Sequence, residues 1–148
     1  MKIEKSTIEL LKRFEGCKLE AYQLKNDKPT IGFGHTGSEV HLGMKITMAQ
    51  AEKYLAEDLK ERQDFINKHV PCELNQNEFD ALISFLYNRG SGNFIKTRLY
   101  SLLKTGNKKD IANAFLDDEN WNFTKYSRGI RASLYKRRRI EREIFMKN

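Results

Sequence analysis

The sequence predicts an α+β fold, in which a small antiparallel sheet near the N-terminus precedes a largely helical remainder. Residues 17–34 form short alternating and β-branched runs that are interrupted by the turn sequence Lys-Asn-Asp-Lys-Pro, a pattern typical of a hairpin. Most other segments carry apolar residues three and four positions apart, which is the spacing of an amphipathic helix. A chain of 148 residues is near the commonest domain size, so we expect one compact domain.

The first predicted helix runs from about Ser6 to Glu15. Ser6 and Glu9 have the spacing of a capping box, in which the serine hydroxyl caps the first turn and the glutamate returns the bond. The apolar positions that follow share one face: Ile8, Leu11 and Phe14. Gly16 favours an end to the helix at this point, so Glu15 is expected to project from its last turn.

The segment after the predicted hairpin is irregular as far as Gly43, and a long helix is expected over residues 47–69. Thr47 and Gln50 have the spacing of a second capping box at its start. Apolar periodicity then predicts helices over residues 75–88, 94–103, 110–116 and 132–146. The sequence Arg-Gly-Ser-Gly at residues 89–92 provides a stop after the first of these.

The net charge of +7 and the sequence pI near 9.4 indicate attraction to a polyanion such as nucleic acid, an anionic membrane surface or a bacterial wall. The cations concentrate at residues 104–109 and 136–142, where we expect solvated helix faces. A nucleic-acid module would interleave these cations with exposed aromatic residues or carry a recognisable motif. The sequence has neither pattern, so we expect no nucleic-acid partner.

The cysteines and the N-terminus give no indication of a metal, redox or export function. Cys17 and Cys72 lack the spacing of a metal or redox motif, so we expect them to be small buried apolar residues and expect no cofactor. Residues 1–14 alternate charged and apolar side chains, and no apolar run of about 18 residues occurs. We expect synthesis in the cytoplasm without a cleaved signal peptide, and no stable membrane insertion.

Residues 14–37 resemble the active-site segment of phage-type lysozymes, glycoside hydrolase family 24. The family pattern is a Glu, eight residues, an Asp or Cys, five residues and a Thr. Glu15 and Thr30 match the first and third positions with this spacing, whereas Leu24 occupies the middle position. The segment therefore resembles that of a wall-cleaving enzyme but lacks the second catalytic group of the family.

Further blocks extend the resemblance over nearly the whole chain. They are Thr30–Gly37, Gly43–Thr47, Leu74–Phe85 with the Gly turn at residues 88–92, and Arg137–Phe145. The resemblance implies a lysozyme-like domain over residues 1–148, with a substrate cleft between two lobes. It also implies a sheet lobe at about 15–46, a linking helix at about 47–69 and a helical lobe at about 70–148.

The resemblance implies that Glu15 is the general acid, because cleavage of a glycosidic bond requires a proton for the leaving oxygen. Glu15 follows the apolar Phe14 and ends a helix, where the negative end of the helix dipole disfavours ionisation. By the same resemblance, Thr30 helps to position the attacking water or the sugar. His35 resembles the structural histidine of the family, which fixes the hairpin to the helical lobe through an acidic partner, and this role is favoured over acid–base catalysis.

Leu24 cannot stabilise positive charge on the sugar or activate water, which are the tasks of the second carboxylate. Three compensations are open. Asp27 is a candidate surrogate carboxylate, although an Asp in this sequence context also fits a purely turn-forming role. Glu20 lies in the same hairpin and fits a solvent-facing strand position. Glu15 can alternatively act with Thr30 and an ordered water.

Two functions remain from this reasoning. The first is a muramidase that hydrolyses the β-1,4 bond between N-acetylmuramic acid and N-acetylglucosamine in peptidoglycan. The alternative is a catalytically degenerate lysozyme-fold module that binds peptidoglycan or a protein partner, because Leu24 replaces the second carboxylate. In either case we expect a monomer that acts on the cell wall, in the periplasm or outside the cell, after release from the cytoplasm.

Overall fold

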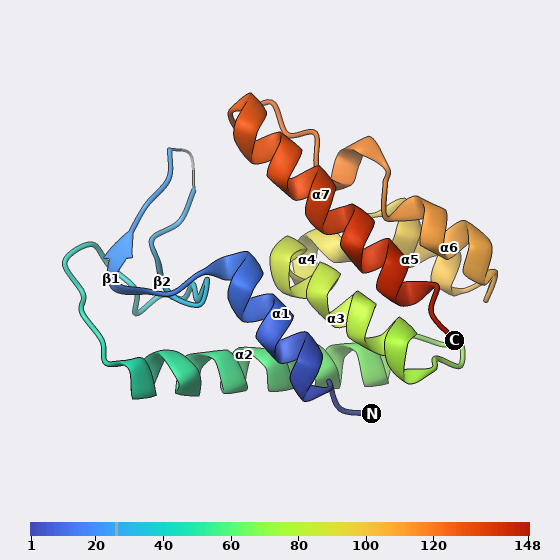
Figure 1. The fold of residues 1–148 in the computed structure, drawn as a ribbon, viewed down its shortest axis with the longest axis horizontal. Helices are drawn as coiled ribbons and strands as arrows, with labels where there is room; N and C mark the ends of the chain where they lie inside the picture. Colours follow the sequence, from blue (N-terminus) through green and yellow to red (C-terminus); the bar gives the residue numbers. More distant parts are fainter. Residues whose placement is uncertain (26) are drawn as a thin grey trace. The chain divides into compact units, whose positions relative to one another are not determined.

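The computed structural model describes residues 1–25 and 27–148 (Figure 1). Asn26, which falls in the predicted hairpin turn, lies outside the described residues. The elements are, in chain order, α1 (Lys5–Glu15), β1 (Lys18–Tyr22), β2 (Thr30–Gly32), α2 (Met48–His69), α3 (Gln76–Arg89), α4 (Ser91–Phe94), α5 (Arg98–Leu103), α6 (Lys108–Ala114), the 3-10 helix η1 (Asp118–Asn120) and α7 (Arg128–Phe145). A small antiparallel sheet and a helical remainder confirm the predicted α+β class.

The chain divides into two compact units, one of residues 8–61 and one of residues 1–7 with 62–148. The division falls inside α1 and inside α2. In the part of the chain that the structure describes, none of the helices is both long and apolar enough to cross a membrane.

The sheet of the unit of residues 8–61 is a short antiparallel pair. Lys18 lies opposite Gly32 and Tyr22 lies opposite Thr30, with an irregularity in the register between them. The segment between β2 and α2, most of which was predicted to be irregular, forms backbone hydrogen bonds with the other edge of β1. The Ala21 amide donates to the Met44 carbonyl at 2.9 Å, and the Ile46 amide donates to the Leu19 carbonyl at 2.9 Å.

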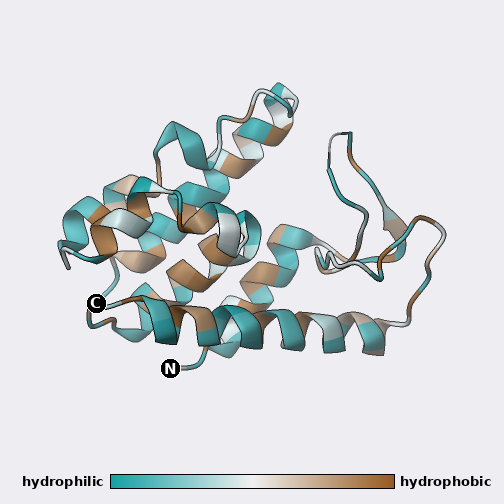
Figure 2. Ribbon diagram, turned by 180° about the vertical axis from the view of Figure 1, so that it is seen from behind, coloured by the Kyte–Doolittle hydropathy of each residue, from teal (hydrophilic) through white to brown (hydrophobic). Residues whose placement is uncertain are grey.

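The long helix α2 begins and ends as predicted. The Thr47 amide donates to Gln50 Oε1 at 2.9 Å, and the Gln50 amide donates to Thr47 Oγ1 at 3.2 Å, which is the reciprocal pair of a capping box. Figure 2 shows α2 as a mainly hydrophilic helix with separate hydrophobic positions. Its buried apolar residues recur at helical spacing: Ala51, Leu55, Leu59 and Ile66.

The core of the other unit is formed by α3 and α7, which pack against each other (Figure 1). Asn75 and Glu78 form a complete capping box at the start of α3, the helix that apolar spacing predicted over residues 75–88. Gly90 ends α3 with a positive φ of 79°, and its amide donates to the Leu86 carbonyl at 2.8 Å. Side chains from Glu78 to Tyr87 are buried, so α3 is covered on all sides.

A buried charge cluster joins α7 to α3, so the expectation of a solvated helix face at residues 136–142 is wrong for Arg137 and Arg138. Arg137 and Arg138 are 5% and 0% exposed, and both contact the fully buried Glu141. Glu141 Oε2 accepts a hydrogen bond from the Ser84 hydroxyl at 2.5 Å, and Arg137 Nη2 donates to the Ser84 carbonyl at 3.1 Å. These pairings compensate charges that are costly to bury alone.

The predicted capping box at Ser6 is wrong, because α1 begins one residue earlier and Ser6 lies inside it. The helix start is capped instead by Asp80 of α3. Asp80 Oδ2 accepts hydrogen bonds from the Glu4 amide at 3.3 Å and from the Thr7 hydroxyl at 2.7 Å. A cap provided by a residue more than 70 positions away leaves no local sequence signal.

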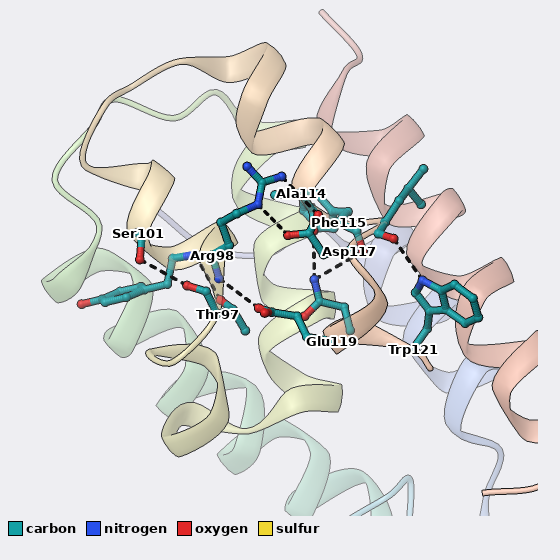
Figure 3. A network of polar contacts seen from close by, with 11 residues as sticks. Thr97, Arg98, Ser101, Ala114, Phe115, Asp117, Glu119 and Trp121 are labelled. Atoms are coloured by element: carbon teal, nitrogen blue, oxygen red, sulfur yellow. Dashed lines mark hydrogen bonds and ion pairs between the residues drawn. The ribbon is translucent and has the colours of Figure 1, made fainter. Parts of the chain in front are cut away.

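The single helix predicted over residues 94–103 is also wrong, because Thr97 has an extended backbone and caps a new helix, α5. The Tyr100 amide donates to Thr97 Oγ1 at 3.1 Å. The next residue, Arg98, forms an ion pair with Asp117 through Nε at 2.9 Å, and its amide donates to Glu119 Oε1 at 2.9 Å (Figure 3). These contacts hold the start of α5 against the loop that follows α6.

Two further helices begin earlier than predicted, because side chains outside the apolar pattern cap them. Asn107 caps α6 and Ser127 caps α7, so α6 begins at residue 108 and α7 at residue 128.

Cys17 and Cys72 are both free thiols, and both are partly exposed rather than buried as predicted. Cys17 Sγ lies 4.0 Å from the sulfur of the exposed Met48.

Candidate active site

Glu15 is the last residue of α1, as predicted, and its half-buried side chain projects where the helix stops. Gly16 has a φ of 66°, and its amide donates to the Lys12 carbonyl at 2.9 Å. A positive φ favours glycine, so the residue after Glu15 allows the chain to leave the helix axis at once.

The Glu15 carboxyl lies directly against the backbone of Gly34. A Cβ atom added to Gly34 would lie 2.5 Å from Glu15 Oε1 and 3.2 Å from Glu15 Cδ. Gly34 also has a φ of 78°, which side chains other than glycine rarely adopt. Glycine is therefore required at this position both by the backbone conformation and by the space that the carboxyl occupies.

The turn that carries Gly34 is closed by two backbone hydrogen bonds between its ends. The Ile31 amide donates to the His35 carbonyl at 2.9 Å, and the His35 amide donates to the Ile31 carbonyl at 2.8 Å. Ile31 is fully buried, so the turn is fixed to the core on one side.

Tyr22 is a candidate site residue that the sequence did not indicate. Burial raises the pKa of its hydroxyl, and the negative charges of Glu15 and Asp27 raise it further. Both carboxylates are therefore close enough to act electrostatically on one hydroxyl group. The sequence carried no signal for this residue, because only the strand register places Tyr22 opposite Thr30, the third position of the family pattern.

Asp27 lies near enough to Tyr22 for its charge to raise the pKa of that hydroxyl, and the structure also gives Asp27 a turn-forming contact. The Asp27 amide donates to the Leu24 carbonyl at 3.1 Å, and Asp27 Oδ1 accepts from the Lys28 amide at 2.9 Å. Both roles considered for this residue are thus compatible with its position. The Leu24 side chain is 46% exposed and belongs to no apolar core.

The two remaining candidates of the hairpin differ in what they contact. The Thr30 hydroxyl donates to the Lys28 carbonyl at 3.0 Å, which fixes the orientation of the Thr30 side chain. Glu20 is exposed on β1 and pairs through its backbone with Lys45, in agreement with a solvent-facing strand position.

His35 is held between two carboxylates and an aromatic ring. Its Nδ1 lies 2.7 Å from Asp58 Oδ2 on α2, and its Nε2 lies 2.6 Å from Glu39 Oε1. The imidazole stacks on Tyr54, with ring centroids 4.1 Å apart and planes 6° from parallel. The predicted acidic partner is thus present twice, and His35 fastens the turn that carries Gly34 to α2.

These contacts determine how the charge of His35 behaves. Burial lowers the pKa of His35, but the hydrogen bonds and charges of Glu39 and Asp58 outweigh burial, so the pKa is raised above its ordinary value of 6.5. The hydrogen bond to His35 correspondingly lowers the pKa of Glu39 from 4.5. Within residues 1–25 and 27–148, no group of three or more His, Cys, Asp and Glu side chains is arranged to hold a metal ion.

Comparison with known sequences gives one family. A profile described as Phage lysozyme matches residues 12–141. The chain is 38% identical over 150 residues to the endolysin of Salmonella phage P22, and the match covers 99% of each protein. It is 38% identical over 148 residues to the endolysin of Bacillus phage B103, where the match covers 99% of this chain and 54% of that protein. The chain therefore spans about half the length of the Bacillus phage endolysins that it matches.

Comparison with solved structures gives the same fold. The muramidase domain of SpmX from Asticaccaulis excentricus superposes with a TM-score of 0.83 at 32% identity, over 99% of both chains. A mutant of P22 lysozyme superposes with a TM-score of 0.75 at 36% identity, again over 99% of both chains.

Replacement of His35 by Asn should lower stability in a pH-dependent manner. Because the pKa of His35 is raised in the folded protein, the charged imidazole contributes its full stabilisation below pH 6.5. This contribution is lost as the pH rises through the His35 pKa of the folded state. Because the pKa of Glu39 is lowered in the folded protein, the ionised carboxylate contributes its full stabilisation above pH 4.5. This contribution is lost as the pH falls through the Glu39 pKa of the folded state. The deficit of His35→Asn, about 2 kcal/mol or roughly 5 °C in Tm, should therefore be largest between these two pH values and shrink toward pH 9.

Thermal unfolding from pH 4 to 9 measures this deficit. His41→Asn is the matched control, because His41 is exposed and its Nδ1 hydrogen-bonds to the Glu39 backbone carbonyl, not to a carboxylate. A deficit of equal size at every pH would contradict an ionic role for His35.

The pKa of the Tyr22 hydroxyl should show whether Asp27 lies close to Tyr22. Since the Asp27 charge raises the pKa of Tyr22, Asp27→Asn should lower that pKa toward the ordinary value of 10.0. The asparagine oxygen can still accept from the Lys28 amide, so the turn is retained. Carbon-13 NMR titration of labelled tyrosine measures the effect. Glu57→Gln, at an exposed position of α2, should leave the Tyr22 titration unchanged, and an unchanged titration in Asp27→Asn would exclude the proposed proximity.

Proposed function

Because this chain belongs to the phage lysozyme family, we propose that it is a muramidase that hydrolyses the β-1,4 bond between N-acetylmuramic acid and N-acetylglucosamine in peptidoglycan. Glu15 is the general acid, which gives its proton to the leaving glycosidic oxygen. The single observation that carries the proposal is the contact between the Glu15 carboxyl and the Gly34 backbone, at the point where α1 ends.

The role of Glu15 is supported by how its carboxyl is held. The Gly34 backbone covers one side of the carboxyl, so this side is closed to water. General acid catalysis requires such a fixed position, because the proton must be within hydrogen-bond reach of the leaving oxygen. The negative charge that develops on the leaving glycosidic oxygen then lies beside the Glu15 proton donor, which is already oriented.

The second carboxylate of the reaction is assigned to Asp27. Its charge and that of Glu15 both act on Tyr22, which supports a common site for the two carboxylates. In this role Asp27 stabilises the positive charge that develops on the sugar ring or activates the attacking water. Thr30 lies opposite Tyr22 on the neighbouring strand and assists by positioning that water or the sugar.

Leu24 favours the second candidate function, a degenerate module that binds peptidoglycan or a protein partner without turnover. Its side chain is apolar and 46% exposed, where the family pattern has a catalytic group. The two functions differ in whether the wall is cleaved. As a muramidase, the chain acts as a monomer on the cell wall, which it reaches in the periplasm or outside the cell after release from the cytoplasm.

Glu15→Gln should lower wall hydrolysis by about 10³-fold or more, because the amide keeps the shape of the side chain but has no acidic proton to transfer. Loss of turbidity of purified peptidoglycan measures the rate. Glu57→Gln removes the same charge from an exposed position of α2 and should retain full activity. Hydrolysis by a folded Glu15→Gln protein would disprove the assignment.

Gly34→Ala should lower hydrolysis by about a hundredfold, because the new methyl group displaces the Glu15 carboxyl from its position. Its backbone strain should also cost about 1 to 2 kcal/mol of stability. Gly43→Ala is the matched control: Gly43 has a φ of 94°, but an added Cβ would meet nothing within 4 Å. Equal loss of activity in both variants would mean that backbone strain, and not the Glu15 contact, is responsible.

The role of Asp27 predicts a rescue. Asp27→Asn should lower hydrolysis by about a hundredfold, and Leu24→Asp in that background should restore at least a tenfold gain, because it returns a carboxylate to the family position. The cost in stability should be only about 1 kcal/mol, since Leu24 is exposed.

Leu42→Asp is the control for the rescue, because Leu42 is also exposed, at 59%, and should restore nothing. If the wild-type protein and folded Leu24→Asp are both inactive toward peptidoglycan, the binding module replaces the enzyme.

A further inference from the structure

The unit of residues 62–148 contains a cavity that no part of the proposed mechanism uses. It has a volume of about 440 Å³ and is lined by the first turn of α3, by α6 and by the end of α7. A volume of this size is within the usual range for small-molecule sites. All the residues that carry the proposed wall hydrolysis belong to residues 8–61.

The lining of this cavity is strongly basic. Four cationic side chains contribute to it: Lys108, Lys109, Arg142 and Lys147. Among the lining side chains, the one carboxylate is Glu78, which is 8% exposed. Glu78 is already compensated, because its Oε2 lies 2.7 Å from Lys108 Nζ and accepts the Asn75 amide at 2.9 Å. Three cations are therefore left without a side-chain carboxylate partner in the lining: Lys109, Arg142 and Lys147.

Arg142 is held in position at the cavity wall. Its Nη2 donates to Asn113 Oδ1 at 2.9 Å, and Asn113 also lines the cavity. The Nε atom of Arg142 is buried and has no hydrogen-bond partner among the described residues. A buried donor without an acceptor is costly, so this guanidinium is suited to an oxygen provided by a ligand.

Three residues give the lining an apolar part. Ala112 and Phe145 are each 2% exposed and form a closed apolar part of the wall. Met146 is 55% exposed and adds a flexible apolar side chain at the edge. A ligand that fills the cavity therefore combines negative charge with an apolar body.

The distribution of charge in the whole chain favours the same kind of ligand. Residues 1–7 and 62–148 contain 19 Lys and Arg against 11 Asp and Glu, a net charge of +8. Residues 8–61 contain 8 Lys and Arg against 9 Asp and Glu, a net charge of −1. The positive potential that attracts anions is therefore generated by the unit that contains the cavity.

We propose that this cavity binds a small organic phosphate monoester, with the phosphate among Lys109, Arg142 and Lys147 and the apolar body against Ala112 and Phe145. A phosphate monoester carries close to two negative charges at neutral pH and three acceptor oxygens. Lysines act as point charges that suit this group, and the arginine adds directed donors. The inference does not depend on wall hydrolysis, and failure of either leaves the other standing.

Phenyl phosphate is the probe, and amide NMR spectra of the whole chain give the readout. Saturable shifts should appear at Ala112, Asn113 and Phe145, with an affinity at least tenfold higher than that for inorganic phosphate or for phenol. Lys109→Glu should weaken phenyl phosphate at least tenfold, because it reverses an exposed charge at the cavity. An unchanged Tm would show that this variant is folded.

Lys125→Glu is the matched control, because Lys125 is exposed and precedes the start of α7, about 25 Å along the helix from its last turn. It should change the affinity less than twofold. The proposal is overturned by the absence of saturable shifts, by equal weakening in both variants, or by shifts scattered over surface lysines. Equal affinity for phenol or for inorganic phosphate would also overturn it, since the site then lacks either the charge or the apolar recognition.

Discussion

The contact between the Glu15 carboxyl and the Gly34 backbone sets the requirements that the surrounding structure meets. It needs a helix that stops at Glu15, which the positive φ of Gly16 provides. It also needs a turn without a side chain at its inner position, closed by the paired hydrogen bonds of Ile31 and His35. His35 then fastens this turn to α2 through Asp58. The structural residues of the unit therefore serve to hold one carboxyl in place.

Local sequence signals predicted the elements whose ends are capped by near neighbours. The box of Thr47 and Gln50 marked the start of α2, and Gly90 marked the end of α3. The predictions failed where a distant residue determines the outcome. Asp80 caps α1 from another helix, and Ser84 with Glu141 allows two arginines to be buried in a segment that looks like a solvated face.

The candidate site was also predictable only in part, because spacing along the chain indicates some of its residues and three-dimensional proximity determines the others. The motif spacing indicated Glu15 and Thr30 as candidates, and it showed Leu24 to be the departure from the family pattern. It did not identify Tyr22, because a strand tyrosine carries no catalytic signal until the register puts it opposite Thr30. The electrostatic influence of both Glu15 and Asp27 on Tyr22 is a property of three-dimensional proximity, which spacing along the chain does not encode.

The central claim is that the chain cleaves the glycan by hydrolysis. In this account Glu15 is the general acid, held against Gly34, and Asp27 replaces the carboxylate that is missing at Leu24. The most direct measurement is mass spectrometry of the muropeptides that the wild-type protein releases from purified, borohydride-reduced peptidoglycan, reduced a second time after digestion with a deuterated reagent. The account predicts soluble products whose newly labelled ends are N-acetylmuramic acid. Protein that sediments with peptidoglycan but releases no muropeptides would contradict it, as would products with anhydro ends, in which no water has been added.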